Sequence, residues 1–430
     1  MLHLELTLNV LLRNTNRTEM KFVNVLLGLL IATGSVSAQE SKRDSLKTDS
    51  IKKVSESAKP AAKKSEWYEK ISLRGYTQVR YNRLLETNSD LQCEQCDRSW
   101  GGTGGFFLRR IRLIFSGQVS DRLYFYIQPD LASSADANNL NFAQIRDAYF
   151  DLGLDAKNEF RLRFGQSKIP FGFENLQSSQ NRLPLDRNDA LNSAASNERD
   201  LGIFFYWAPK KIRERFANLV SSGLKGSGDY GVFAFGAYNG QTANRNEVND
   251  QPHIISRLSY PIKLGKQIIE PGLQGYHGKY IVSTLTSGLK TPTQFIDQRA
   301  AATFVLYPQP FGLQVEYNIG TGPEYSTATK IIEQKRLEGG YALASYAHRF
   351  KNQLLIPFIR YHFYDGGKKF ERDARSYNVN ELEVGTEWQP FKNFELVTMY
   401  TISKRRFEDA TKPINTQEGR LLRIQFQFNY

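Results

Sequence analysis

Two pairs of residues in this sequence have types and spacings that could do chemistry. Cys93 and Cys96 form a C-x-x-C pair, which can hold a disulfide, exchange thiols or ligate zinc. No second cysteine pair and no nearby histidine exists, so the spacing favours a local disulfide over zinc. Asp147 and Asp151 could mimic paired hydrolytic carboxylates, but a spacing of four on one strand face is too weak a signal for catalysis. We therefore expect no catalytic residue, no metal site and no cofactor.

The composition narrows the class of protein. The chain has 22 Tyr and 28 Phe but only 3 Met, and aromatic side chains suit pleated sheets better than helices. Its longest apolar run, residues 22–33, is shorter than the ~20 residues that a membrane-spanning helix needs. The net charge of +13 suggests an anionic partner without identifying it, and we expect no nucleic acid. An all-β protein is the favoured class.

The first part of the chain has the pattern of an export signal. A basic residue after Met20, an apolar stretch over 22–32 and small residues up to Ala38 follow the order of a secretory signal peptide. We expect residues 1–38 to be this signal, with Met20 as the true start. Residues 39–66 are rich in Ser, Lys, Asp and Glu and cannot bury a core, which predicts a flexible charged periplasmic tail.

Beyond that tail, residues 67–430 alternate between apolar and polar positions. At the C-terminal end, Leu422, Ile424 and Phe426 alternate with Arg423 and Gln425. This is the pattern of a strand with one apolar face and one polar face. Sixteen such stretches are predicted, over residues 71–81, 107–119, 123–130, 143–152, 160–166, 200–207, 230–239, 253–260, 268–281, 295–307, 311–322, 337–347, 354–364, 376–389, 394–405 and 420–430.

The connections between these stretches alternate in length. Residues 82–106 and 167–199 are long, whereas 120–122 and 390–393 are short. An even number of antiparallel strands, with long loops at one end and short turns at the other, describes a transmembrane β-barrel of the outer membrane. Residues 208–229 are too long for a turn and predict a helix or an extra excursion.

Several stretches resemble the phosphate-selective porin O and P family, in the form found in Bacteroidetes-type bacteria. The most specific of them is Arg163-Phe164-Gly165-Gln166-Ser167-Lys168-Ile169-Pro170-Phe171-Gly172, followed by Arg199-Asp200-Leu201-Gly202. Further matches are Phe106 to Arg112, Tyr124 to Asp130 and Arg146 to Tyr149. The resemblance implies a sixteen-stranded, homotrimeric outer-membrane diffusion channel whose third external loop folds inward. The family name alone is weak evidence for phosphate as the solute.

Basic residues on the polar faces of the predicted strands could line an anion pathway. Fixed positive charges in a narrow pore replace part of the hydration that an anion loses. The residues expected at such positions, or in the inward-folding loop, are Arg110, Arg112, Arg161, Arg163, Lys168, Arg187 and Arg360. We expect the inward arginines of the second and fifth strands to outnumber nearby acids, and hence a weak anion preference.

The same alternation also predicts an acidic pore face. Its residues are Glu316, Glu381, Glu383 and Glu387, on strands far around the barrel from the basic ones. Such an arrangement would set up a field across the pore. It favours a general or mildly anion-selective porin over a dedicated phosphate channel.

The pore's narrowest point is predicted in the connection that follows residue 166. A sixteen-stranded barrel is too wide for its wall side chains to fill, so selectivity requires a segment folded into the lumen. The connection over residues 167–198 is the longest in the barrel, and it mixes basic and acidic residues.

The sequence therefore predicts a porin of the Gram-negative outer membrane, surrounded by its lipid. It would pass small hydrophilic solutes by passive diffusion, with phosphate and other anions among the candidate solutes. The alternatives are a barrel enzyme, or an adhesin without channel activity. No histidine lies in a recognisable nucleophile context, so we do not expect an enzyme. Ion conductance would separate the channel from both alternatives.

Overall fold

The computed structural model of the chain describes residues 66–91, 93, 104–133 and 142–430. The predicted signal peptide and the predicted tail up to residue 65 lie outside the described residues. Among the residues that are described, no helix is both long and apolar enough to span a membrane.

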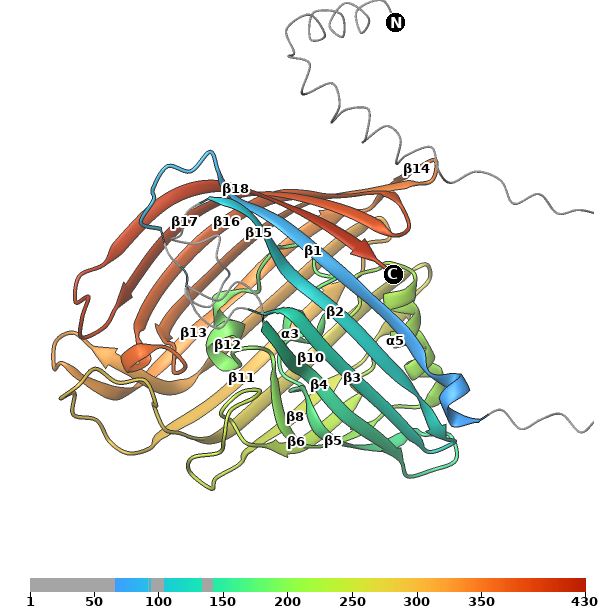
Figure 1. Ribbon diagram of the computed structural model, residues 1–430, viewed down its shortest axis with the longest axis horizontal. Helices are drawn as coiled ribbons and strands as arrows, with labels where there is room; N and C mark the ends of the chain where they lie inside the picture. The colour runs from blue at the N-terminus through green and yellow to red at the C-terminus, as the bar shows by residue number, and fades with distance from the viewer. Residues whose placement is uncertain (1–65, 92, 94–103, 134–141) are drawn as a thin grey trace, which may run out of the picture. The chain divides into compact units, whose positions relative to one another are not determined.

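The strands form one closed antiparallel sheet (Figure 1). Strand β1 (Ser72–Leu84) pairs with β2 (Gly105–Ser120) on one side and with the last strand, β18 (Thr416–Asn429), on the other. Apart from two interrupted strands, over residues 253–264 and 331–350, every other strand pairs with its neighbours in the chain. The predicted fold class, a closed antiparallel barrel, is confirmed.

The remaining strands follow one another around the barrel. They are β3 (Leu123–Ser133), β4 (Phe142–Gly153), β5 (Phe160–Lys168), β6 (Arg199–Trp207), β7 (Phe233–Tyr238), β8 (His253–Ser259), β9 (Ile262–Leu264), β10 (Gln267–Tyr280), β11 (Phe295–Leu306), β12 (Phe311–Ser326), β13 (Ile331–Tyr346), β14 (His348–Phe350), β15 (Gln353–Gly367), β16 (Ser376–Phe391) and β17 (Phe394–Glu408). Short 3-10 turns η1 (Trp67–Lys70) and η2 (Arg372–Ala374) lie outside the sheet.

Two of the barrel strands are interrupted, so eighteen segments make sixteen strands. Segments β8 and β9 both pair with β10, and Pro261, which has no backbone N–H to donate, lies in the break. Segments β13 and β14 both pair with β15. All sixteen predicted stretches correspond to a barrel strand. The connection predicted between residues 322 and 337 is corrected, because β12 and β13 extend until only 327–330 separate them.

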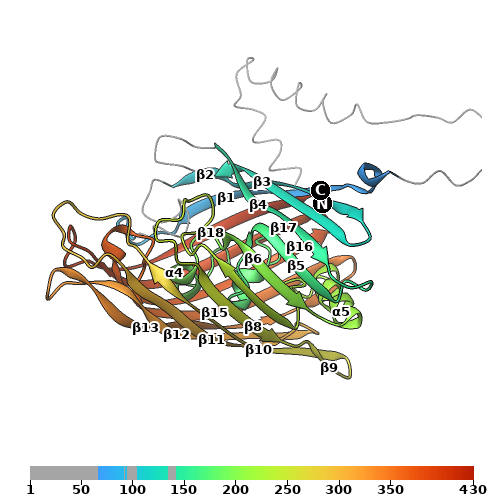
Figure 2. The ribbon, with the colours of Figure 1, turned by 90° about the horizontal axis from the view of Figure 1, so that it is seen from below.

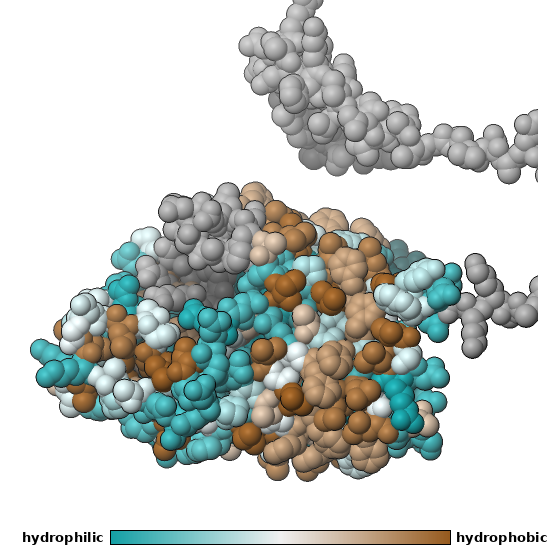
Figure 3. Space-filling model, turned by 60° about the horizontal axis from the view of Figure 1, so that its bottom comes forward, coloured by the Kyte–Doolittle hydropathy of each residue, from teal (hydrophilic) through white to brown (hydrophobic). Residues whose placement is uncertain are grey.

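Along the strands, polar side chains point into the barrel and apolar side chains point outward, the reverse of the arrangement in a soluble protein. In β18 the polar Arg423, Gln425 and Gln427 are buried, whereas Phe428 is 47% exposed on the outer surface. Figure 3 shows brown hydrophobic residues gathered over the outer surface of the barrel. An apolar outside and a polar inside are what a barrel in a lipid bilayer requires.

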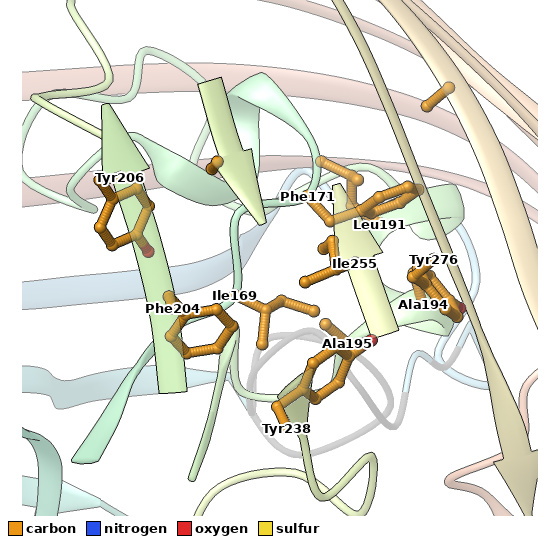
Figure 4. Close-up of a cluster of buried hydrophobic side chains, with 12 residues drawn as sticks. Ile169, Phe171, Leu191, Ala194, Ala195, Phe204, Tyr206, Tyr238, Ile255 and Tyr276 are labelled. Atoms are coloured by element: carbon orange, nitrogen blue, oxygen red, sulfur yellow. The ribbon is translucent and has the colours of Figure 1, made fainter. Parts of the chain in front are cut away.

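The longest described connection folds into the barrel. We call residues 169–198, between β5 and β6, the inward loop; it contains the short helices α3 (Phe173–Leu176) and α4 (Asp189–Ala194). Phe171 stacks edge-on against Tyr276 of β10 at 5.1 Å, within a buried apolar cluster (Figure 4). Leu183 and Leu185 pack on the wall at β13 and β15. The prediction that this connection folds inward is confirmed.

The opposite end of the barrel carries one long connection among its short turns. Residues 208–232, between β6 and β7, contain helix α5 (Lys210–Ser221), as Figure 2 shows. The prediction of a helix or excursion over 208–229 is confirmed, and the structure decides for a helix. We call residues 208–232 the periplasmic connection.

Candidate functional site in the barrel lumen

Arg360 of β15 anchors the first half of the inward loop. Its guanidinium donates to Glu174 of α3, to the Asp186 carbonyl at 2.9 Å, and to Glu383 of β16 at 2.6 Å. Glu174 also accepts hydrogen bonds from Asn188, at 2.8 Å from the backbone and 2.7 Å from the side chain. Arg360 and Glu383, predicted as parts of separate basic and acidic faces, therefore form one buried pair.

Two aspartates anchor the second half of the loop to the far wall. Asp186 lies between Arg80 of β1, at 3.4 Å, and Arg423 of β18. Asp189 accepts from Arg405 of β17 at 2.8 Å and from Lys368 of the external loop after β15. These contacts reach the two strands that close the barrel.

Glu198, at the end of the inward loop, is shared by several cations. Its carboxylate lies 3.8 Å from Lys168, 3.6 Å from Arg182 and 3.2 Å from Arg187, and it also contacts Arg199. Burial alone would raise the pKa of Glu198, but these cations outweigh burial and lower that pKa well below its usual range. The carboxylate therefore stays ionised, and the cations around it outnumber it.

Arg110 and Arg112 of β2 lie on the barrel wall beside these cations. Arg112 pairs with Asp130 at 2.8 Å and donates to Ser179 of the inward loop at 3.0 Å. Arg110 donates to the side-chain oxygen of Gln78 at 2.7 Å, and no ion pair is recorded for it among the described residues. Both arginines lie on the inner face of β2, the face that the alternation predicted for them.

We call this group the basic cluster. It comprises Arg80, Arg110, Arg112, Arg146, Lys168, Arg182, Arg187 and Arg199, with the acids Asp130, Asp147, Asp186 and Glu198, each at most 9% exposed. Arg199 pairs with Asp147 and Arg146 donates to the Asn197 carbonyl, both at 2.9 Å. The cluster thus holds eight cations and four carboxylates, one of which, Asp186, is also shared with Arg423. In the described part of the chain, the Nε of Arg110, and the Nε and Nη1 of Arg182, are buried without a hydrogen-bond partner.

Arg161 and Arg163 of β5 also face inward, and each has a carboxylate partner. Arg163 makes a two-pronged bond to Asp151, at 2.7 and 2.9 Å, and stacks over the Tyr149 ring at 3.8 Å. Arg161 pairs with Asp229 of the periplasmic connection at 2.9 Å. Asp229 is also bound by Arg213 at 2.8 Å, so three cations share two carboxylates here, and the expectation that the inward arginines of β2 and β5 outnumber nearby acids stays a prediction.

Most of the predicted acidic face is also paired. Glu381 accepts from Arg405 and from His362, both at 2.6 Å, and Glu387 accepts from Lys225 at 2.5 Å. Glu316 is the exception, since it accepts from the Phe173 backbone N–H at 2.7 Å and from Asn318 at 3.2 Å. The acidic residues are therefore built into the anchoring network.

One group of side chains has the composition of a metal site. Potential ligand atoms of Asp189, His362 and Glu381 lie within 4.8 Å of one another. Both carboxylates already accept from Arg405, and Asp189 also accepts from Lys368. A metal ion would have to share these carboxylates with two buried cations, so the donor set suits an ion-pair network better than a metal.

The structure describes only one of the two cysteines of the predicted disulfide. Cys93 is disulfide-bonded, and Cys96 is the other cysteine of the sequence. Cys96 lies outside the described residues.

Sequence reasoning missed several arginines that complete the site. Arg80, Arg405 and Arg423 lie on the polar faces of their strands, so the same alternation could have identified them. Lys225 and Asp229 have no such signal, because they belong to an irregular connection. The acids of the inward loop likewise show no periodic pattern.

Comparison with known proteins agrees with this geometry. The sequence model of the family described as phosphate-selective porin O and P matches residues 85–430. The fold is similar to the outer membrane channel DcaP of Acinetobacter baumannii, with a TM-score of 0.52 and 13% identity over 84% of this chain and 97% of that one. It is also similar to Salmonella typhi OmpF in complex with daunomycin, with a TM-score of 0.51 and 13% identity over 83% and 97%. The chain matches no curated protein.

A closed barrel with an apolar exterior, a charged interior and a segment folded into its lumen is built to let solutes through a membrane. Family and fold both indicate a channel rather than an enzyme. The chain belongs to the phosphate-selective porin O and P family and is an outer-membrane channel for the passive diffusion of small hydrophilic solutes.

Proposed function

We propose that this channel prefers anions and that the basic cluster beside the inward loop sets the preference. The excess of cations over carboxylates in the cluster is the observation that carries the proposal. Fixed positive charges in a confined lumen offset the hydration that an anion loses on entry, and they repel cations.

The unpartnered donors of Arg110 and Arg182 point to the same preference. Among the described residues no acceptor lies within hydrogen-bonding distance of these atoms. Because the atoms are buried, they attract a passing anion through their electrostatic field and not by direct contact. On the other wall, three of the four predicted acids are neutralised by Arg360, Arg405 and Lys225, so they oppose anions only weakly. Both features support a general anion preference.

Reversal potentials of the purified protein in planar bilayers, across a potassium chloride gradient, test the proposal. The wild-type pore should show an anion-selective potential, and the double variant Arg110→Gln/Arg182→Gln should move it towards the cation side. Arg336→Gln is the matched control, because Arg336 is 69% exposed and pairs with Glu338 rather than with a member of the cluster. A cation-selective wild-type pore, or equal shifts in both variants, would overturn the proposal.

Two further expectations concern the assembled protein. Because the family resemblance implies a trimer, we propose a homotrimer, which the mass of the unheated protein in detergent should reveal. We also propose that residues 1–38 are removed on export. N-terminal sequencing of outer-membrane material should then begin at Gln39.

A further inference from the structure

The periplasmic connection is larger than a barrel turn needs to be. It joins neighbouring strands β6 and β7, whereas β2 and β3 are joined through Asp121 and Arg122 alone. A twelve-residue helix, α5, occupies much of the connection. Closing the hairpin does not explain such a segment.

Helix α5 lies against the inner wall of the barrel. Its apolar side chains Ile212, Phe216 and Leu219 are at most 4% exposed, and they belong to one buried cluster with Val305 of β11 and Phe173 of the inward loop. The helix therefore packs on the wall and on the inward loop together. Figures 1 and 2 show it at the same end of the barrel as η1.

The chain after α5 crosses to the opposite wall. The Lys225 Nζ lies 2.5 Å from Oε1 of Glu387 on β16, and the two side chains are 4% and 1% exposed. Strands β7 and β16 lie seven positions apart in the closed ring of sixteen strands, almost as far as the ring allows. The Lys225 carbonyl also accepts from Gln177 of the inward loop at 2.6 Å. The periplasmic connection thus spans the lumen just below that loop.

A buried ion pair across the lumen serves to fix geometry. Desolvating two charges offsets much of their attraction, so such a pair adds little stability compared with apolar packing. It does determine where the connection lies, because a lysine taken out of water requires its carboxylate. Arg349, from the rim at β14, adds a weak bond of 3.4 Å to the Ser222 carbonyl.

We propose that the periplasmic connection is a second constriction of this channel, fixed across the lumen by the Lys225–Glu387 pair, and that it limits the size of the solutes that pass. This constriction acts separately from the basic cluster. The inference rests on the diffusion channel and not on its anion preference, so it stands whichever ions the pore prefers.

Reversing the charges of the pair tests the inference. Lys225→Glu places two carboxylates against each other and should release the connection, which raises single-channel conductance severalfold. It should also admit larger uncharged sugars in liposome-swelling assays, where charge plays no part. The double variant Lys225→Glu/Glu387→Lys restores an attractive pair and should return both quantities to wild-type values.

Lys211→Glu is the matched control, since it makes the same charge change on the exposed face of α5. It should leave the size limit for sugars unchanged. A heat-modifiable band on gels verifies that each barrel is folded. If Lys225→Glu fails to fold, replacing residues 210–231 by Asn-Gly removes the connection outright and should widen the sugar limit further.

Three results would overturn the inference. They are an unchanged sugar limit in folded Lys225→Glu or in the shortened barrel, a limit that widens equally in the Lys211→Glu control, and a double variant that behaves like Lys225→Glu alone. Anion preference, measured in the same bilayers, reports separately on the basic cluster.

Discussion

At the scale of single residues, buried ion pairs decide where the inward loop lies. Arg360 contacts Glu174 and Glu383 through its nitrogens and also binds the Asp186 carbonyl. Removing one partner from such a network leaves uncompensated charges in a dry environment, which costs more than the intact pair contributes. Arg360 is therefore more important for the position of the loop than for attracting anions.

We predict that Arg360→Ala lowers the free energy of unfolding by about 3–5 kcal/mol, the usual cost of breaking a buried pair. The guanidinium-induced unfolding of the refolded barrel measures this change. The exposed Arg336–Glu338 pair provides the control, and Arg336→Ala should cost no more than about 1 kcal/mol. Equal effects of the two variants would show that Arg360 is not an anchor.

The sequence could predict which residues face inward but not what they bind. Alternation places Arg163 and Asp151 on polar faces, yet their pairing depends on the register of β4 against β5. Arg161 binds Asp229, 68 residues further along the chain, in a segment without periodicity. Charge balance in the pore therefore depends on three-dimensional packing that a strand pattern does not encode.

At the scale of elements, two connections fill a barrel whose strands alone would leave an open tube. The strands themselves were predictable because a period of two with an apolar outer face recurs in sixteen stretches between residues 71 and 430. The apolar residues of α5, at 212, 216 and 219, also have helical spacing. Their position inside the barrel could not be foreseen, because a helix with an apolar face can bury it on many surfaces.

We predict that deleting residues 176–192 from the inward loop raises single-channel conductance severalfold. The deletion removes Asp186 and Asp189, which fix the loop to β17, β18 and β1, together with Leu183 and Leu185. Anion preference should change little, because Arg182 and Arg187 are lost together with Asp186 and Asp189. A folded deletion variant with unchanged conductance would show that the loop is not a constriction.

At the scale of the whole molecule, closure of the sheet depends on its last strand. The outer face of β18 carries Phe426 and Phe428, and its backbone pairs with β1 from Asn429 to Leu422. Without this strand, β1 and β17 would each present an unpaired edge to lipid, where no water can satisfy their backbone groups.

Deleting residues 421–430 should therefore abolish the folded, heat-modifiable form on gels. Deletion of residues 411–414, in the external connection before β18, is the control and should leave that form intact. Normal folding without residues 421–430 would refute closure by this strand.

The most direct test of the central claim is the current through the purified wild-type protein in a planar bilayer under a salt gradient. An open porin with an excess of cations beside its inward loop should give stepwise conductance increments and a reversal potential on the anion side. A folded barrel that gives no increments, or one with a cation-side reversal potential, would contradict this account.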